Sequence, residues 1–179
     1  GNVTLDVEGD AVGQTVTHGS FKLTQALANS WKVVLGQHAM ELGPEVLEEY
    51  AQKLGITQSL SFDGLTTAAG SFDLTDAENF EIAWAGCGQY NDLINPCQYM
   101  TLMGVIANGG QAALPYLMDR VEGGLLTSYE HGKTTTKRVL ERSTTDTIAQ
   151  MMRNNVVNAS MAPGSSRIWR SAPSRALPK

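Results

Sequence analysis

Cysteine and histidine are scarce in this chain, and their scarcity argues against several kinds of site. Only two cysteines occur, Cys87 and Cys97, which are too few for a disulfide framework. The three histidines, His18, His38 and His131, are far apart, and the sequence has neither Cys-x-x-Cys nor a close histidine pair. Because a zinc site normally needs four ligands, no metal site is predicted, and we interpret the cysteines as two buried thiols.

Long apolar runs and an excess of basic residues are also missing. No run approaches the roughly 20 apolar residues of a bilayer-spanning helix, so we expect a soluble chain without a transmembrane segment. The first ten residues (GNVTLDVEGD) lack the basic and apolar regions of a signal peptide. The net charge of −5 disfavours non-specific binding to nucleic acid, which depends on clustered lysine and arginine.

The composition that is present is that of a globular domain. A length of 179 residues, with 42% hydrophobic and 17% charged residues, is typical of one domain or most of one. Helical periodicity comes first and strand-like segments follow, which predicts an α+β fold. We expect a partial domain over 1–157, made of a hairpin (1–20), a helical part (21–110) and strands with a last helix (111–157).

Three helices are predicted in the helical part. The first runs over 24–42, with a threonine cap and apolar residues at helical spacing. The second begins with a proline and stops at a glycine, over 44–55. Residues 56–78 are rich in serine, threonine, glycine and aspartate and indicate a long surface loop. The third helix begins at Asn95-Pro96 and ends at Asn108-Gly109-Gly110.

Strand-like segments and one more helix complete the predicted domain. The strands are expected around 114–121, 125–129 and 134–140. Gly123-Gly124 is expected to turn the chain between the first two of them. Ser143, with Asp146 three residues later, resembles a capping box and predicts a last helix that extends to about Val156.

Two stretches of the sequence together resemble one known family. They are 23–43 (LTQALANSWKVVLGQHAMELG) and 82–110 (IAWAGCGQYNDLINPCQYMTLMGVIANGG). The pattern is similar to the middle of the penicillin-binding protein transpeptidase domain, which is part of the serine β-lactamase-like superfamily. Within the second stretch, the resemblance assigns 86–91 (GCGQYN) to a glycine-glutamine turn. It assigns 95–100 (NPCQYM) to the start of the next helix and 107–110 (ANGG) to its end. The implied role of this run is structural, behind the wall of the active site.

The resemblance implies a fold and an activity for the parent protein. The fold would be an incomplete penicillin-binding transpeptidase or β-lactamase-like fold, a helical cluster with a small antiparallel sheet. The activity would be D,D-transpeptidation, which cross-links peptidoglycan stem peptides through an acyl-serine intermediate and is blocked by β-lactams. The family uses no metal or cofactor, and the parent would lie at the extracytoplasmic face of the bacterial cell membrane.

Two of the three catalytic motifs of that family are not found. No serine lies three residues before any lysine, so Ser-x-x-Lys is absent and the nucleophile is expected upstream of Gly1. In Gly19-Ser20-Phe21-Lys22 the spacing of two would place serine and lysine on different helix faces. Lys133-Thr134-Thr135 comes nearest to Lys-Ser/Thr-Gly, but it has a β-branched residue where glycine is required.

The middle motif, Ser-x-Asn, has an altered counterpart in Ser30-Trp31-Lys32. By resemblance, Ser30 would relay a proton between the lysine base and the leaving group. Lys32 would stand where an asparagine hydrogen-bonds the substrate backbone, and Trp31 would lie beside the substrate. Lysine has donors but no acceptor, so it cannot replace both functions of an amide. The alternative is that Ser30 and Lys32 are ordinary helix residues.

The last residues, 158–179, have a different character. They contain four basic residues, no acidic residue and three of the six prolines. One interpretation is a disordered basic tail. The other is a frameshift near Asn158, because suitable codons for 172–179 can be read in a shifted frame as Ala-Lys-Ser-Gly-Thr-Ala-Glu.

Three hypotheses for the function follow. The first is a truncated or frameshifted transpeptidase domain that is inactive as an isolated chain. The second is a non-catalytic binding or scaffold module derived from the same fold. The third, an unrelated hydrolase that uses Ser30 with His38, is weak because eight helical residues separate the two side chains by about 12 Å. Missing elements would expose apolar surface, so self-association is expected.

Overall fold

The structure is a computed structural model that describes residues 23–124, 126–132, 135–136 and 138–158. The helices are α1 (Leu23–Ala28), α2 (Lys32–Leu42), α3 (Pro44–Lys53), α4 (Asn79–Gly86), α5 (Pro96–Ala107) and α6 (Arg142–Asn158). The strands are β1 (Ser61–Phe62), β2 (Leu65–Thr66), β3 (Arg120–Gly123) and β4 (Leu126–Glu130). The predicted hairpin over 1–20 and the tail after Asn158 lie outside the described residues.

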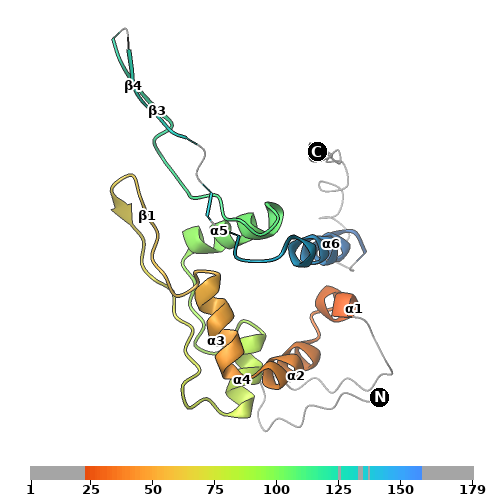
Figure 1. Ribbon diagram of the computed structural model, residues 1–179. Helices are drawn as coiled ribbons and strands as arrows, with labels where there is room; N and C mark the ends of the chain where they lie inside the picture. The colour runs from red at the N-terminus through yellow and green to blue at the C-terminus, as the bar shows by residue number, and fades with distance from the viewer. Residues whose placement is uncertain (1–22, 125, 133–134, 137, 159–179) are drawn as a thin grey trace.

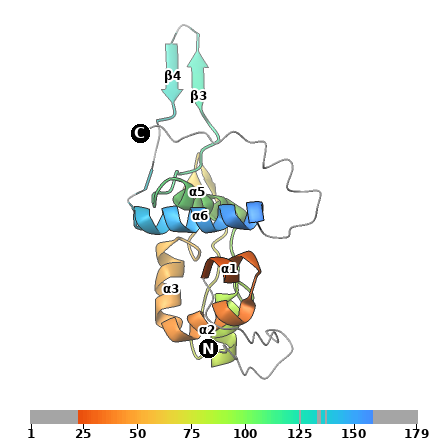
Figure 2. The ribbon, with the colours of Figure 1, turned by 90° about the vertical axis from the view of Figure 1, so that its right-hand side faces the viewer.

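The helices form two groups, and the strands lie apart from them. Figures 1 and 2 show α1 to α4 below and α5 with α6 above, while the β3–β4 hairpin projects away from the helices. The main contacts between helices join α2 to α4, α1 to α6 and α5 to α6. This arrangement confirms a helical cluster with small antiparallel sheets. None of the described helices is long and apolar enough to cross a membrane.

The closest helix packing joins α2 to α4 through small residues. A Cβ on Gly36 would lie only 3.1 Å from the Cβ of Ala83, and a Cβ on Gly86 would overlap that of Ala39. These glycines therefore let the two backbones approach, and Val33 and Ile82 are buried beside them. The helix α4 was not predicted; its start is a capping box in which Glu81 accepts from the Glu78 backbone at 2.9 Å.

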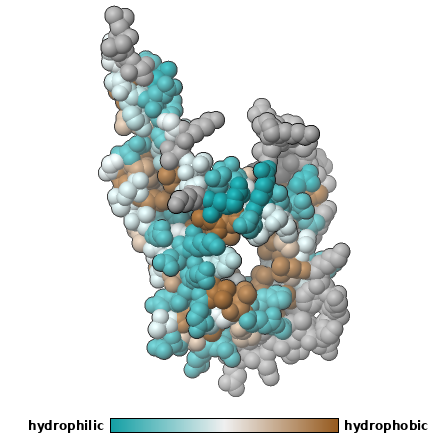
Figure 3. All heavy atoms as spheres, in the orientation of Figure 1, coloured by the Kyte–Doolittle hydropathy of each residue, from teal (hydrophilic) through white to brown (hydrophobic). Residues whose placement is uncertain are grey.

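The core is built from small side chains, and many large apolar ones stay exposed. Most buried hydrophobic residues are alanine or valine. Met100 and Leu117, in contrast, are 70% and 69% exposed. Figure 3 shows apolar surface around a hollow in the middle of one face, between the upper and lower helices. The described residues thus leave apolar surface without cover.

Both hairpins differ from the predicted pattern. The segment 56–78, predicted as a loop, contains the β1–β2 hairpin, in which Phe62 pairs with Leu65. The first predicted strand, 114–121, is reduced to β3, which begins only at Arg120 and pairs with β4. The third predicted strand, 134–140, is not formed over the described residues. They have only an isolated bridge, which pairs Thr135 with Ala113. The Gly123-Gly124 turn is confirmed.

Asp63 ties the two hairpins together. This residue turns the chain between β1 and β2 with φ of +48°, and its Oδ2 accepts from the backbone N–H groups of Leu117 and Met118 at 2.5 and 2.9 Å. These two N–H groups hold the pKa of the Asp63 carboxyl below its usual value. At the base of β3–β4, the His131 ring stacks on Tyr116 with 3.7 Å between ring centroids. These contacts anchor the hairpin at its base.

The last helix begins before its predicted cap. Because α6 starts at Arg142, Ser143 lies inside the helix and the predicted capping box is wrong. Asp146 instead lies 3.9 Å from the Arg142 guanidinium, and both side chains are exposed. Thr145, which is fully buried, donates to the Arg142 carbonyl at 2.9 Å. The side chain of Asn155 reaches the carbonyl of Leu27, joining α6 to α1.

Candidate active-site segment

Ser30 lies in a break between two helices, so the prediction of one continuous helix over 24–42 is wrong. The Trp31 N–H donates to the Ala26 carbonyl at 2.9 Å and the Ser30 N–H to the Leu27 carbonyl at 3.2 Å. This pair of bonds is the Schellman motif, in which the residue at the position of Ser30 adopts a positive φ. Ser30 has φ of +51° and is exposed. The helix end thus presents the serine to solvent instead of placing it on a helix face.

Trp31 and Lys32 begin the next helix. Trp31 occupies the N-cap position of α2 without a side-chain cap, and its carbonyl accepts from the N–H groups of Val34 and Leu35. Lys32 is the first residue of α2, where a positive charge opposes the helix dipole. The lysine therefore needs a polar partner to be favourable in this position.

Gln89 provides that partner. Its Oε1 accepts from Lys32 Nζ at 3.4 Å and from Trp84 Nε1 at 2.9 Å. In addition, the Cys87 thiol donates to the Lys32 carbonyl at 3.3 Å. These contacts bring the glycine-glutamine turn next to the altered Ser-x-Asn segment. Lys32 and Gln89 are 57 residues apart in the sequence. Sequence reasoning treated them separately and missed this contact.

Neither cysteine is a fully buried thiol, so that prediction is wrong. Cys87 is half-buried and Cys97 is exposed near the start of α5. Burial raises the pKa of the Cys87 thiol, and the nearby Lys32 charge opposes that shift only in part. Cys87 is therefore not activated as a nucleophile.

Aromatic side chains support the turn that holds Gln89. Trp84 lies 5.2 Å from Phe80 and 6.2 Å from Tyr90 between ring centroids. The Tyr90 hydroxyl donates to Glu81 at 2.9 Å, which raises the pKa of Tyr90. The Glu78 N–H, with help from that hydroxyl, lowers the pKa of Glu81. The turn is therefore fixed against α4 by both rings and hydrogen bonds.

The Asn95-Pro96-Cys97-Gln98 run has structural contacts. The Asn95 side chain caps α5 by accepting from the Cys97 N–H at 2.9 Å, which confirms the predicted helix start. Gln98 is 4% exposed, and its Nε2 donates to the Leu54 carbonyl at 3.2 Å. The run therefore binds α5 to the end of α3.

The glycines at the end of α5 allow a close backbone contact. A Cβ on Gly110 would overlap the Leu140 carbonyl, and Gly110 has φ of +98°. The carbonyl of Gly110 accepts from the Val139 N–H at 2.8 Å. Glycine is required at this position for both reasons, and the predicted end of the third helix is confirmed.

The remaining sequence candidates are dispersed. His38 Nδ1 lies 3.0 Å from Glu41 on the exposed side of α2, whereas Ser30 lies outside that helix. Gly19-Ser20-Phe21-Lys22 and Lys133-Thr134 lie outside the described residues. Among the residues that the structure describes, no three histidine, cysteine or acidic side chains are grouped to hold a metal ion.

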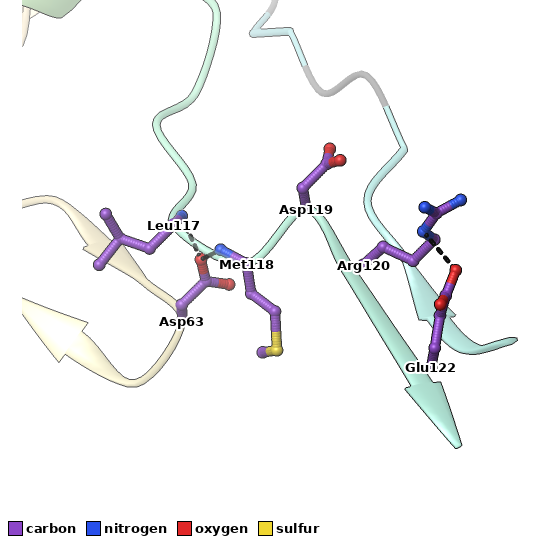
Figure 4. A pocket seen from close by; sticks show the side chains of 6 residues that line it. All are labelled: Asp63, Leu117, Met118, Asp119, Arg120 and Glu122. Atoms are coloured by element: carbon purple, nitrogen blue, oxygen red, sulfur yellow. Dashed lines mark hydrogen bonds and ion pairs between the residues drawn. The ribbon is translucent and has the colours of Figure 1, made fainter. Parts of the chain in front are cut away.

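One hollow of 730 Å³ lies beside the β3 strand, and its side chains do not converge. Figure 4 shows Asp63 directed at the backbone of Leu117 and Met118, and Asp119 directed elsewhere. Arg120 is paired with Glu122 of its own strand at 3.1 Å. The Asp63 carboxylate thus holds the hairpin, and Arg120 and Glu122 pair with each other.

Comparison with known proteins identifies the family. Residues 7–170 match the family model of the penicillin binding protein transpeptidase domain. The match therefore extends beyond residue 157, the predicted C-terminal end of the domain. A solved structure of the D,D-transpeptidase domain of a peptidoglycan glycosyltransferase from Eggerthella lenta is 24% identical, with a TM-score of 0.70 over 84% of this chain. This chain covers 41% of that one.

Two structures of penicillin-binding protein A from Mycobacterium tuberculosis are also similar. One is 18% identical with a TM-score of 0.68, and covers 78% of this chain and 35% of its own. The other, a ceftriaxone acyl-enzyme complex, is 17% identical with a TM-score of 0.72. The match covers 86% of this chain and 36% of the chain in that complex. The present chain thus spans less than half the length of these structures, and their likeness establishes the fold. Because the family model matches most of its length, the chain belongs to the penicillin-binding protein transpeptidase domain family.

Proposed function

We propose that this chain is part of a D,D-transpeptidase domain and forms no acyl-enzyme by itself. The parent would cross-link peptidoglycan stem peptides through an acyl-serine, at the extracytoplasmic face of a bacterial membrane, and would be acylated by β-lactams. Family membership supports the parent activity. The proposed inactivity rests on the absence of Ser-x-x-Lys, since no serine lies three residues before any lysine in this sequence.

The geometry around Ser30 supports the same proposal. A serine nucleophile needs a base within hydrogen-bond reach. The ammonium of Lys32 is engaged with Gln89 at the start of α2, and Ser30 is exposed in the preceding turn. Ser30 is therefore proposed as the proton-relay serine of the altered Ser-x-Asn motif, with Lys32 in the asparagine position and Trp31 beside the substrate.

The experiment is intact-mass spectrometry after incubation with an excess of benzylpenicillin. We expect no covalent adduct, while circular dichroism shows that the protein is folded. Lys32→Asn, which restores the family's residue, serves as the matched variant and is expected to remain free of adduct as well. A mass gain of one opened penicillin on the native chain would refute the proposed inactivity.

A second candidate is a non-catalytic binding or scaffold module. The observation in its favour is the amount of exposed apolar surface, with Met100 and Leu117 among the most exposed large side chains. Surface of this kind marks an interaction site in many proteins. We propose that self-association of the chain covers this surface, so that the mass in solution exceeds that of one chain.

The frameshift near Asn158 stays a proposal. The family match continues to residue 170, so the first residues of the tail still align with the family. Sequencing the encoding DNA decides between the two interpretations: codons that yield no Lys-Ser-Gly peptide in any frame would end the frameshift hypothesis.

A further inference from the structure

A second cavity, of 530 Å³, lies between α3, the end of α4 and the first half of α5. This volume falls within the range of small-molecule pockets. The cavity is lined mostly by aliphatic and aromatic side chains, among them Leu47, Tyr50, Leu54, Phe72, Tyr99 and Leu102. It is therefore a different place from the Ser30 segment and from the hollow beside β3.

Hydrogen bonds between distant segments hold the walls of this cavity. Leu93 and Ser71 exchange two backbone hydrogen bonds, of 2.8 and 2.9 Å, which fix the wall around Phe72. The Gln98 amide binds the Leu54 carbonyl and joins the α3 wall to α5. A Cβ on Gly70 would overlap the Leu93 carbonyl, so this wall is also tightly packed from behind. The cavity is thus built by tertiary contacts.

Asp92 introduces a single charge into this apolar lining. Of the described residues that line the cavity, Asp92 alone has a charged side chain. Its carboxylate has no hydrogen-bond or ion-pair partner among the described residues, and burial raises the pKa of Asp92 to about 6. A partly desolvated charge without a counter-ion is unfavourable, and a bound cation would compensate it.

The groups around Asp92 leave room for such a cation. Tyr50 of α3 and Tyr99 of α5 are the other titratable side chains in the lining, and the end of α4 and the Phe72 segment add none. Lys53, the lysine at the end of α3, has its Nζ 5.1 Å from the centroid of the Tyr50 ring and forms no ion pair with Asp92. The aromatic rings in the wall would also attract a ligand ammonium.

We propose that this cavity binds an amphiphilic cation, with its apolar or aromatic body between α3 and α5 and its ammonium at Asp92. An apolar wall with one uncompensated carboxylate favours this class over anions, which Asp92 repels. It also favours this class over fully polar ligands, because most of the lining is aliphatic or aromatic. The site is independent of the proposed transpeptidase chemistry, whose substrate analogues are acylating anions.

The test is isothermal titration calorimetry with three probes of one shape. They are 4-phenylbutylammonium, the neutral 4-phenylbutanol and the anionic 4-phenylbutyrate, each titrated into the whole chain at pH 7.5. Asp92→Asn removes the charge at nearly constant volume. Asp76→Asn is the matched control, because Asp76 is exposed, lies outside the cavity lining and has a positive φ that asparagine tolerates.

The ammonium is expected to bind about tenfold more tightly than the alcohol, because it forms a half-buried ion pair with Asp92. The butyrate is expected to bind more weakly than both. Asp92→Asn should remove that tenfold preference and leave the alcohol unchanged, whereas Asp76→Asn should behave as the native chain. Because Asp92 becomes protonated below about pH 6, affinity for the ammonium should fall between pH 7.5 and pH 5 while affinity for the alcohol does not.

Several results would overturn the proposal. They are equal affinity for the three probes, unchanged ammonium binding in Asp92→Asn, or no binding of any probe. Ammonium binding that vanishes as the protein concentration is raised would assign the cavity to a second copy of the chain instead. If Asp92→Asn does not fold, the pH comparison on the native chain decides alone.

Discussion

Ser30 holds a backbone conformation that costs a serine free energy. Its φ of +51° lies in the left-handed region, which is unfavourable by about 1–2 kcal/mol for residues with a Cβ. Strain of this kind is found at functional sites, where the surrounding structure maintains it. The two Schellman hydrogen bonds that close the turn provide such support here. A residue chosen for stability alone would be glycine.

Ser30→Gly is therefore expected to raise the free energy of unfolding by about 0.5–1 kcal/mol, since relief of strain exceeds the added entropy of the unfolded chain. The measurement is urea denaturation followed by circular dichroism. Ser59→Gly is the control, because Ser59 is exposed and has no positive φ, and it should be neutral or destabilising. A Ser30→Gly protein no more stable than the native chain would show that the turn is not strained.

At the scale of elements, the packing of α2 on α4 depends on the absence of side chains. The helices are neighbours through Gly36 with Ala83 and through Gly86 with Ala39, where an added methyl group finds no space. Gly104 of α5 offers a contrast, because nothing lies within 4 Å of the place its Cβ would take. The two kinds of glycine should respond oppositely to the same substitution.

We expect Gly86→Ala to destabilise the protein by about 1–3 kcal/mol, the usual cost of overpacking. Gly104→Ala should stabilise it by about 0.5–1 kcal/mol, because alanine is the better helix former where space is open. Thermal and urea unfolding of both variants provide the measurement. If the two substitutions shift stability in the same direction, the close α2–α4 packing is refuted.

The anchoring of β3–β4 by Asp63 is a second property of elements. The pKa of Asp63 is lower in the folded protein than its ordinary value of 3.8. The Asp63 carboxylate therefore stabilises the fold at pH values above 3.8, and this stabilisation is lost as the pH falls through the folded pKa. Asp63→Gly removes the carboxylate and keeps the turn, since glycine accepts φ of +48°.

Hydrogen exchange should detect this loss directly. The amides of Leu117 and Met118 are expected to exchange faster in Asp63→Gly than in the native chain, and in the native chain faster at about pH 3 than at pH 5 after correction for intrinsic rates. Asp76→Gly is the control, because Asp76 is exposed, has φ of +58° and is not the acceptor of either amide, so both amides should be unchanged. Equal protection in Asp63→Gly would contradict the anchoring.

For the whole molecule, the balance of buried and exposed apolar residues is unusual. The buried set is dominated by alanine and valine, while leucine and methionine side chains remain in contact with water. Figure 3 shows apolar residues on both sides of a hollow that the described residues leave open. Association of two or more copies would remove part of this surface from water.

Size-exclusion chromatography with light scattering should therefore give a mass above the 19.2 kDa of one chain, rising with concentration. Met100→Glu and Leu117→Glu should lower the apparent mass, because each places a charge on the exposed apolar surface. Gln52→Glu, at an exposed polar position of α3, adds the same charge and should have no effect. A monomer at all concentrations would exclude self-association.

Signals confined to a few residues were enough to predict several elements of this protein. Pro44 and Asn95-Pro96 begin helices, and Gly109-Gly110 and Gly123-Gly124 turn the chain, as expected. These residues restrict their own backbone dihedrals, so their effect needs no distant partner. The stretches that resemble the transpeptidase family also belong to the sequence alone, and the family match agrees with them.

The tertiary structure decided what depends on residues far apart in the chain. The apolar spacing over 24–42 predicted one helix, but the chain turns at Ser30, and α1 then packs on α6 while α2 packs on α4. The contact of Lys32 with Gln89 and the cavity around Asp92 join segments that no local pattern relates. Such contacts form when folding brings distant segments together, and this is why the Ser30 turn and the Asp92 cavity were not predicted from the sequence.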